Sequence, residues 1–129
     1  MKLYLAAPWS HREEAREAAR KLTAAGHRIT EPWWDHRDVN GLDDDEADEL
    51  VDQAWRDLEG VDNADRFILL NLGKSEGKAV ELGWALCRRI MVIAVGKRGE
   101  HSNNVFHYLP QIKWVSTIEE LIEWLKKRS

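Results

Sequence analysis

The sequence has little cysteine and no long apolar run, and each scarcity excludes a class of protein. The single cysteine, Cys87, cannot form an internal disulfide, which argues against a secreted disulfide scaffold and favours a reducing compartment. No stretch approaches the roughly 18 apolar residues of a membrane span. The apolar run before Pro8 covers only residues 3–7, too few for the core of a signal peptide. We therefore expect a cytoplasmic protein with no membrane partner.

An excess of basic charge is also missing. The chain has 19 basic and 23 acidic residues, and its net charge of −4 has the wrong sign for a protein that neutralises a nucleic acid polymer. Glycine-rich dinucleotide loops, phosphate-binding P-loops and GxSxG elbows are absent. The histidines lack HExxH-like spacing and have no pair of cysteines beside them. We predict no nucleic acid partner, no metal site and no cofactor.

Apolar runs alternate with segments of helical period, which is typical of a parallel sheet with crossover helices. The length of 129 residues favours one domain, residues 1–129. Right-handed crossovers then predict an α/β fold with a doubly wound five-stranded parallel sheet, flavodoxin-like or Rossmann-like, in the order 2-1-3-4-5. The predicted strands are 2–6, 27–31, 66–71, 90–95 and 111–115, and the predicted helices are 11–25, 43–61, 77–88 and 117–128.

Capping patterns mark the helix ends. Ser10 and Glu13 have the spacing of a capping box, Gly26 marks a C-terminal stop, and Thr117 with Glu120 forms a second box. The second helix shows an apolar stripe, and the third shows one on Ala79, Leu82, Gly83 and Leu86. Four tryptophans in regular elements are expected to pack inside: Trp55, Trp84, Trp114 and Trp124. Cys87, within the third predicted helix, is expected to be a small core residue.

The sheet order places the ligand crevice at the carboxyl ends of strands one and three. The loops there are "APWSHR" and "LGKSEGK". Both run into helix N-termini, where unpaired N–H groups favour an anion. The candidate anion-binding residues are Ser10, His11, Arg12, Ser75 and Gly77, and Pro8 is a further candidate substrate-binding residue of the first loop. An alternative for Ser10 is that its hydroxyl only caps its own helix.

Two acids stand out near this crevice. Periodicity places Glu81 opposite the apolar face of its helix, which indicates an exposed acid, yet it lies within about one turn of a helix start that opens onto the crevice. Asp57 falls roughly 20° outside the apolar stripe of the second helix. We expect it to be half-buried, with a perturbed pKa.

Three tryptophans, Trp9, Trp33 and Trp34, fall in expected loops. Exposed loop aromatics could stack a flat ligand such as a nucleobase. The alternative is that one or more of them covers the end of the sheet. Residues 31–45 form a connection long enough to predict a functional loop.

Three segments carry a resemblance to a known family. "LYLAAP", "DLEGVDNADRFILLN" and "GKAVELGWA" resemble, in order and spacing over residues 1–95, the nucleoside 2-deoxyribosyltransferase superfamily, which includes the 2'-deoxynucleoside 5'-phosphate N-hydrolases. That family shows a Y-L-A-G-P-like start, a D-x-x-x-x-x-A-D segment and G-T-x-x-E-L-G. This chain departs at Ala7, where the family has Gly, and at Lys78, where it has Thr.

The resemblance implies that Glu81 is the nucleophile that attacks C1' of the sugar and forms a glycosyl-enzyme ester. Asp57 would assist the leaving base or contact the sugar, and Tyr4 would orient Glu81. Ser75 would contact a 5'-phosphate. Transfer to a second base would make the protein a transferase, and transfer to water a hydrolase.

The family often completes its site from a neighbouring subunit, which implies a homodimer or higher oligomer and makes Asn104 a candidate in trans. The substrate would be a small nucleoside or nucleotide. Two rivals remain. A ribonucleotide phosphoribohydrolase would carry a P-G-G-x-G-T-x-x-E loop, which is absent. A non-catalytic nucleotide sensor would be consistent with Ala7 and Lys78.

Overall fold

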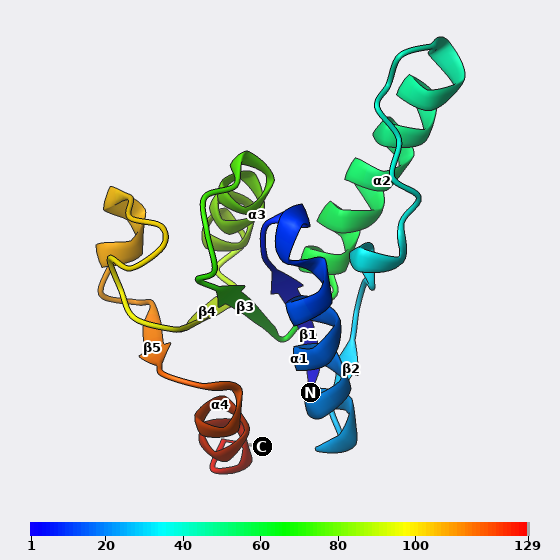
Figure 1. Cartoon of the computed structure of the whole chain (residues 1–129). Helices are drawn as coiled ribbons and strands as arrows, with labels where there is room; N and C mark the ends of the chain where they lie inside the picture. Colours follow the sequence, from blue (N-terminus) through cyan, green and yellow to red (C-terminus); the bar gives the residue numbers. More distant parts are fainter. Residues whose placement is uncertain (129) are drawn as a thin grey trace.

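The five strands form one parallel sheet in the order β2-β1-β3-β4-β5, as predicted (Figure 1). The computed structural model describes residues 1–128, so residue 129 lies outside the described part of the predicted domain. β1, β3 and β4 are almost completely buried, which explains why their sequences are runs of apolar residues rather than alternating ones. The strands are β1 (Lys2–Ala6), β2 (Arg28–Ile29), β3 (Arg66–Leu70), β4 (Met91–Val95) and β5 (Lys113–Val115).

The helices cover both faces of this sheet. α1 and α4 pack together on one face, and α2 and α3 pack together on the other (Figure 1). Each predicted helix is present within a few residues of its expected bounds. The α-helices are α1 (Arg12–Ala24), α2 (Asp44–Asp62), α3 (Glu76–Cys87) and α4 (Ile118–Lys126), and three short 3₁₀ turns are η1 (Trp9–His11), η2 (Trp33–Asp35) and η3 (Val105–Tyr108).

Two of the three predicted helix-end signals are confirmed. Gly26 has φ +95°, the left-handed conformation that ends α1. Thr117 accepts from the backbone N–H of Glu120 at 3.1 Å and caps α4. The capping box at Ser10 is wrong, because Ser10 lies inside η1 and α1 begins at Arg12 with no side-chain cap. The backbone N–H of His11 bonds to the carbonyl of Pro8 instead (2.9 Å), which shifts the helix start.

α2 extends well beyond the sheet, and this overturns one packing prediction (Figure 1). Only Gly60 and Val61, in its last turn, are buried. Trp55, expected to pack inside, is 58% exposed, and Val51 is 57% exposed. The apolar stripe of α2 therefore faces outward for most of its length. Trp84, Trp114 and Trp124 do pack against the core.

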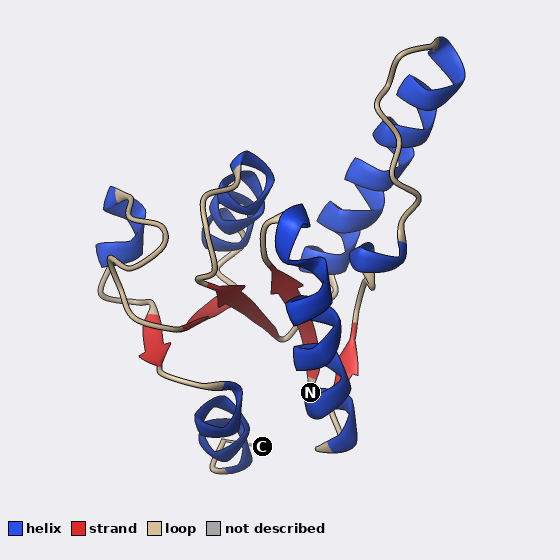
Figure 2. Ribbon diagram, in the orientation of Figure 1, coloured by secondary structure: helices blue, strands red, loops and turns tan. Residues whose placement is uncertain are grey.

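The long connection before α2 runs back along that helix (Figure 2). Arg37 pairs with Glu49 at 2.6 Å, and the side chain of Gln53 donates to the carbonyl oxygen of Arg37 at 3.0 Å. These contacts hold residues 36–43 against α2. Among the described residues, no helix combines the length and apolarity that crossing a membrane requires.

Candidate active site

A hydrogen bond joins Tyr4, in the middle of β1, to Glu81 on α3. Tyr4 lies in β1, has no exposed surface, and stacks on Phe67 of β3 with ring centroids 5.7 Å apart. Its hydroxyl donates to Oε2 of Glu81 at 2.7 Å. Glu81 is half-buried, so the periodicity-based expectation of an exposed acid is wrong. The two residues are 77 positions apart in sequence. They come together because β1 pairs with β3, the strand that leads into α3.

The orientation of α3 explains this placement. Its buried residues are Lys78, Leu82 and Ala85, and Glu81 lies on the same side. Ala79, Gly83 and Cys87, which were expected to pack inside, are exposed. The helix therefore turns a lysine and a glutamate inward beside Leu82 and Ala85, and leaves Ala79 and Gly83 outward. Departures of this kind from the usual pattern are expected at functional sites.

Burial sets the protonation of this pair. Burial raises the pKa of Glu81 to about 8, the hydrogen bond from Tyr4 opposes that rise, and the negative charge of Asp57 adds to it. Burial, followed by the charges of Glu81 and Asp57, raises the pKa of Tyr4 well above its ordinary value. Tyr4 therefore remains a hydrogen-bond donor at every physiological pH, and Glu81 can change charge near neutrality.

Asp57 stands on the inner side of α2 and is half-buried, as predicted from its helical phase. Burial raises its pKa to about 6, His36 lowers it, and Glu31 raises it further. Its Oδ1 atom is buried without a hydrogen-bond partner among the described residues. Two acids with raised pKa values thus act on one another electrostatically, one from α2 and one from α3.

A close approach at Gly60 brings α2 to this point. A Cβ atom at residue 60 would lie 2.7 Å from Cβ of Glu31 and 3.0 Å from Cδ2 of the Tyr4 ring, so a larger residue does not fit without movement. The carbonyl of Gly60 accepts from the hydroxyl of Thr30 at 2.6 Å. The last turn of α2 therefore lies directly on β1 and β2, and Asp57, one turn earlier, is held beside Tyr4.

Sequence reasoning missed two residues of this cluster, Glu31 and His36. Glu31 follows β2, and His36 follows η2; Nε2 of His36 lies 3.0 Å from Oε1 of Glu31. Glu31, His36 and Asp57 offer ligand atoms within 4.8 Å of one another, so they are the residues of this site that could hold a cation. A signal was available: the predicted order puts the end of strand two beside strand one, and residues 31–45 were expected to form a functional loop.

The two predicted crevice loops are in contact. A Cβ atom at Gly73 would lie 3.6 Å from both Pro8 Cγ and His11 Nε2. Ser75 caps α3, since its hydroxyl oxygen accepts from the backbone N–H of Lys78 at 3.1 Å. Two other candidate anion-binding residues of these loops, Ser10 and Gly77, are exposed, whereas Ser75 is half-buried.

The charged side chains of these loops have partners within the chain. His11 bonds to Glu14, and Arg12 donates to the carbonyl of Trp9 at 3.1 Å while lying 4.9 Å above its ring. Lys78 is 3% exposed and donates to the carbonyl of Gly73 at 2.6 Å, and burial lowers its pKa. Lys78 thus joins the first turn of α3 to the loop that precedes it.

The tryptophans divide into two kinds. Trp33 and Trp34 are each 6% exposed, so the expectation that they are exposed is wrong. The indole N–H of Trp33 donates to the carbonyl of Leu5 at 2.6 Å, which makes it a cover for the end of β1, the alternative left open above. Trp9 is half-buried and borders a hollow of about 240 Å³ together with Val39 and Leu50. Of the three, Trp9 keeps a surface that a ligand can reach.

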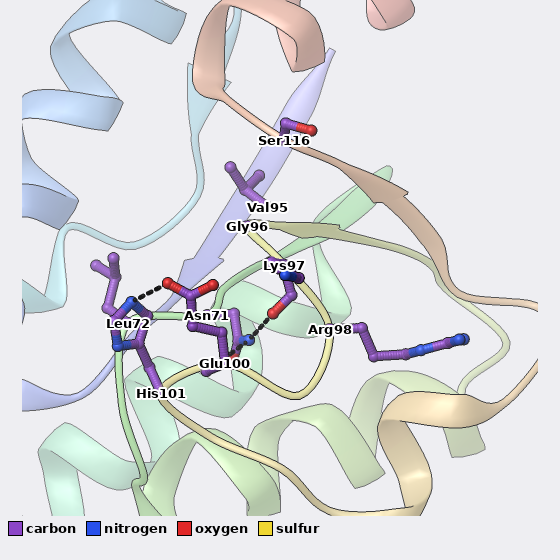
Figure 3. Close-up of a pocket in the computed structure, with 9 residues that line it drawn as sticks. All are labelled: Asn71, Leu72, Val95, Gly96, Lys97, Arg98, Glu100, His101 and Ser116. Carbon is purple, nitrogen blue, oxygen red and sulfur yellow. Dashed lines mark hydrogen bonds and ion pairs between the residues drawn. The ribbon is translucent and has the colours of Figure 1, made fainter.

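Two larger hollows lie elsewhere. One of about 610 Å³ opens at the carboxyl ends of β3, β4 and β5, where Asn71 donates to the carbonyls of Lys97 and Glu100 (Figure 3). The other, about 430 Å³, is an apolar hollow between α3 and η3 that Asn104 borders. Oδ1 of Asn104 accepts from the backbone N–H of Phe106 at 2.9 Å. Neither hollow is lined by Tyr4, Asp57 or Glu81.

The chain matches known proteins by family pattern and by fold. Two solved structures share its fold: a conserved protein from Enterococcus faecalis V583 (TM-score 0.71, 18% identity, 100% of this chain and 99% of that one) and the CMP N-glycosidase BcmB from Clostridium botulinum (TM-score 0.58, 16% identity, 100% of both chains). No curated protein matches it in sequence. The family model described as nucleoside 2-deoxyribosyltransferase matches residues 3–112. The resemblance seen in three short segments thus extends over most of the chain, which belongs to the nucleoside 2-deoxyribosyltransferase family.

Proposed function

We propose that the protein cleaves or transfers the N-glycosidic bond of 2'-deoxynucleosides or their 5'-monophosphates through a glycosyl ester on Glu81. The observation that carries this proposal is the 2.7 Å hydrogen bond from buried Tyr4 to Glu81, beside Asp57, in a member of this family. Tyr4 fixes one carboxylate oxygen and leaves the other free to react. Retaining glycosidic chemistry needs this combination of one oriented nucleophilic carboxylate and one acid.

In the first half of the reaction, an oxygen of ionised Glu81 attacks C1' while the bond from C1' to the base nitrogen breaks. The bonding electron pair goes to the base, which takes a proton from the carboxyl group of Asp57. In the second half, water or a second base attacks C1', its proton passes to the Asp57 carboxylate, and Glu81 is released. The raised pKa of Asp57, about 6, allows it to carry that proton near neutral pH.

The start of α3 supports a phosphate at the other end of the ligand. Its N-terminus carries the helix-dipole charge and free backbone N–H groups, which favour an anion. Ser75 caps that turn and is half-buried, and Arg12 begins α1 directly after the neighbouring loop. The BcmB neighbour is a CMP N-glycosidase, which adds support for a nucleoside 5'-monophosphate and for water as the acceptor.

A second candidate is a nucleotide sensor without catalysis. Lys78 favours it, because a buried lysine stands on the inward side of α3 where the family has a small threonine. Its ammonium group would place a positive charge beside the phosphate end and could hold a nucleotide firmly. The assay below separates the two, since a sensor binds nucleotides and releases no base.

We further propose that the protein acts as a homodimer or larger assembly in the cytoplasm. α2 exposes Leu50, Val51 and Trp55, and such a continuous apolar stripe usually marks an interface. Asn104 does not face the acids of its own chain, so a contribution from it requires a second subunit. Its exposed neighbour Phe106 would accompany it across the interface.

The test is incubation with each deoxynucleoside and deoxynucleoside monophosphate, with and without a free acceptor base, followed by chromatography. Exchange of bases identifies a transferase, and release alone identifies a hydrolase. Glu81→Ala should abolish both. The matched control is Glu123→Ala, which removes an exposed glutamate paired with Lys126 on α4, away from the site. Turnover by Glu81→Ala at the parent rate would refute the assignment.

A further inference from the structure

His36 lies between two carboxylates and faces each with a different ring nitrogen. Its Nε2 is 3.0 Å from Oε1 of Glu31, and its Nδ1 is 3.9 Å from Oδ1 of Asp57. The His36 side chain is 8% exposed, whereas those of Glu31 and Asp57 are 18% and 23% exposed. The three side chains therefore form a row, with the most deeply buried one in the middle.

The row assigns the ring protons. An ionised carboxylate only accepts hydrogen bonds, so the contact with Glu31 places a hydrogen on Nε2 of His36. In the neutral ring, Nδ1 then carries a lone pair toward Asp57. Oδ1 of Asp57 is the buried oxygen that lacks a hydrogen-bond partner among the described residues. The 3.9 Å separation exceeds a hydrogen bond and closes with a small movement of either side chain.

We propose that Glu31, His36 and Asp57 form a proton relay that keeps Asp57 loaded as the acid for the leaving base, with His36 as a positioning residue. This inference rests on the proposed function. The Asp57–His36 pair shares one proton between Oδ1 of Asp57 and Nδ1 of His36. Asp57 gives this proton to the base nitrogen as the bond from C1' to the base breaks, which leaves Asp57 ionised and His36 neutral. When water or a second base attacks C1', the proton it loses passes to Asp57, so the pair again shares one proton and the cycle is balanced.

The charges around Asp57 fit this role. The groups that act on it are His36 and Glu31 from the segment after β2, Arg56 on its own helix, and Glu81 on α3. Of these, His36 faces Asp57 with a ring nitrogen that can donate or accept a proton, Nδ1 at 3.9 Å from Oδ1. Glu31 orients His36 as a buried carboxylate orients the histidine of a hydrolase triad, by fixing its tautomer and stabilising the charged ring.

A divalent cation is the competing explanation, because the three side chains offer ligand atoms within 4.8 Å of one another. One imidazole nitrogen binds one ion, and here the two carboxylates lie at opposite nitrogens. A cation between Glu31 and Nε2 would have to break their 3.0 Å contact. The relay uses the contacts as they stand, so we argue for it and treat the cation as a result that would overturn it.

The experiment compares two leaving groups in the His36→Gln variant. Glutamine keeps an N–H that can reach Glu31 and has no nitrogen that titrates, so the fold is retained while the relay is broken. With an ordinary deoxynucleotide, whose base must be protonated to leave, we expect kcat/KM to fall ~10-fold or more, which is less than the roughly 10²–10⁴-fold that a general acid contributes, because Asp57 itself remains. With a 7-methyl-2'-deoxyguanosine substrate, whose base leaves as a neutral molecule without a proton, we expect a change under about 2-fold.

The control is His27→Gln, at the opposite end of β2, which should leave both rates unchanged. Glu31→Gln should act like His36→Gln. Equal losses on both substrates in His36→Gln would mean a structural role and overturn the relay. Activation by added Zn²⁺ or Mn²⁺, with loss on chelation, would assign the cluster to a cation and also overturn it.

Nitrogen NMR of the His36 ring separates the relay from the proposed function. The relay predicts a ring that carries its hydrogen on Nε2, and an Nδ1 signal that shifts in Asp57→Asn, where the facing carboxylate is gone. Without catalysis by the parent on any substrate, the proposed function fails, and the ring signals still judge the relay. A ring with its hydrogen on Nδ1 instead, or an Nδ1 signal that does not change in Asp57→Asn, would refute it.

Discussion

Replacing Tyr4 by Phe should lower kcat/KM at neutral pH and leave it little changed at high pH. The Tyr4 hydroxyl lies 2.7 Å from Glu81 and lowers the pKa of that acid, which burial holds at about 8. A hydrogen bond to a charged group contributes about 1.5–3 kcal/mol. Because one pKa unit corresponds to about 1.4 kcal/mol, its loss should raise the pKa of Glu81 by about one to two units.

The rate follows from the ionised fraction of Glu81. At pH 7 an acid whose pKa is about 8 is ionised in about a tenth of molecules, and one to two further units reduce that to about a hundredth or a thousandth. The kcat/KM of Tyr4→Phe should therefore be about 10- to 100-fold below the parent at pH 7.

The assay is the ratio of variant to parent kcat/KM between pH 5 and pH 10. The deficit should shrink at high pH and vanish where Glu81 is ionised in both proteins. Phe keeps the ring that stacks on Phe67, so thermal unfolding should remain cooperative. A ratio that is constant across this range would refute the reasoning, because Tyr4 would then act by packing rather than through the charge of Glu81.

Three further predictions follow from the same geometry. In the folded protein the pKa of Glu81 is about 8, above its ordinary 4.5, so the stability that protonated Glu81 contributes is lost as the pH rises from 4.5 to about 8. Glu81→Gln should therefore unfold at a higher temperature than the parent at pH 9 and at a similar temperature at pH 4. Calorimetry that shows the reverse order would contradict this prediction. The parent profile of kcat/KM should be a bell with limbs near 6 and 8, and Asp57→Asn should lose the decline at high pH; retention of that decline would exclude Asp57 as the acid. Gly60→Ala places a Cβ 2.7 Å from Glu31 and 3.0 Å from Tyr4, so denaturant titration should show a loss of about 1–3 kcal/mol, and a variant of parent stability would show that α2 can move away freely.

The sequence predicts the helices, strands and sheet order of this protein well, because these depend on local patterns. Buried parallel strands are continuous apolar runs, and right-handed crossovers leave few possible orders, so the order 2-1-3-4-5 follows. The half-burial of Asp57 also follows from helical phase alone. In each of these cases neighbouring residues carry the information.

The site could be predicted only in part, because it violates those patterns. α3 turns Lys78 and half-buried Glu81 inward and exposes Ala79 and Gly83, so only part of the predicted apolar face, Leu82 and Leu86, packs against the core. The hydrogen bond that holds Glu81 comes from Tyr4, 77 residues away. The family resemblance brought these two together where periodicity could not. His36 was missed because its partners come from two elements that only the folded chain places side by side.

The exposed apolar stripe of α2 and the inward-facing carboxylate of Asp57 belong to the same helix. Trp55 and Asp57 are two residues apart, about 200° around the helix, so they point in nearly opposite directions. A second subunit that packs against the Trp55 side of α2 would also limit how far the Asp57 side can move away from Glu81. Specific activity would then depend on protein concentration. On dilution it would decrease, while each separate chain stayed folded.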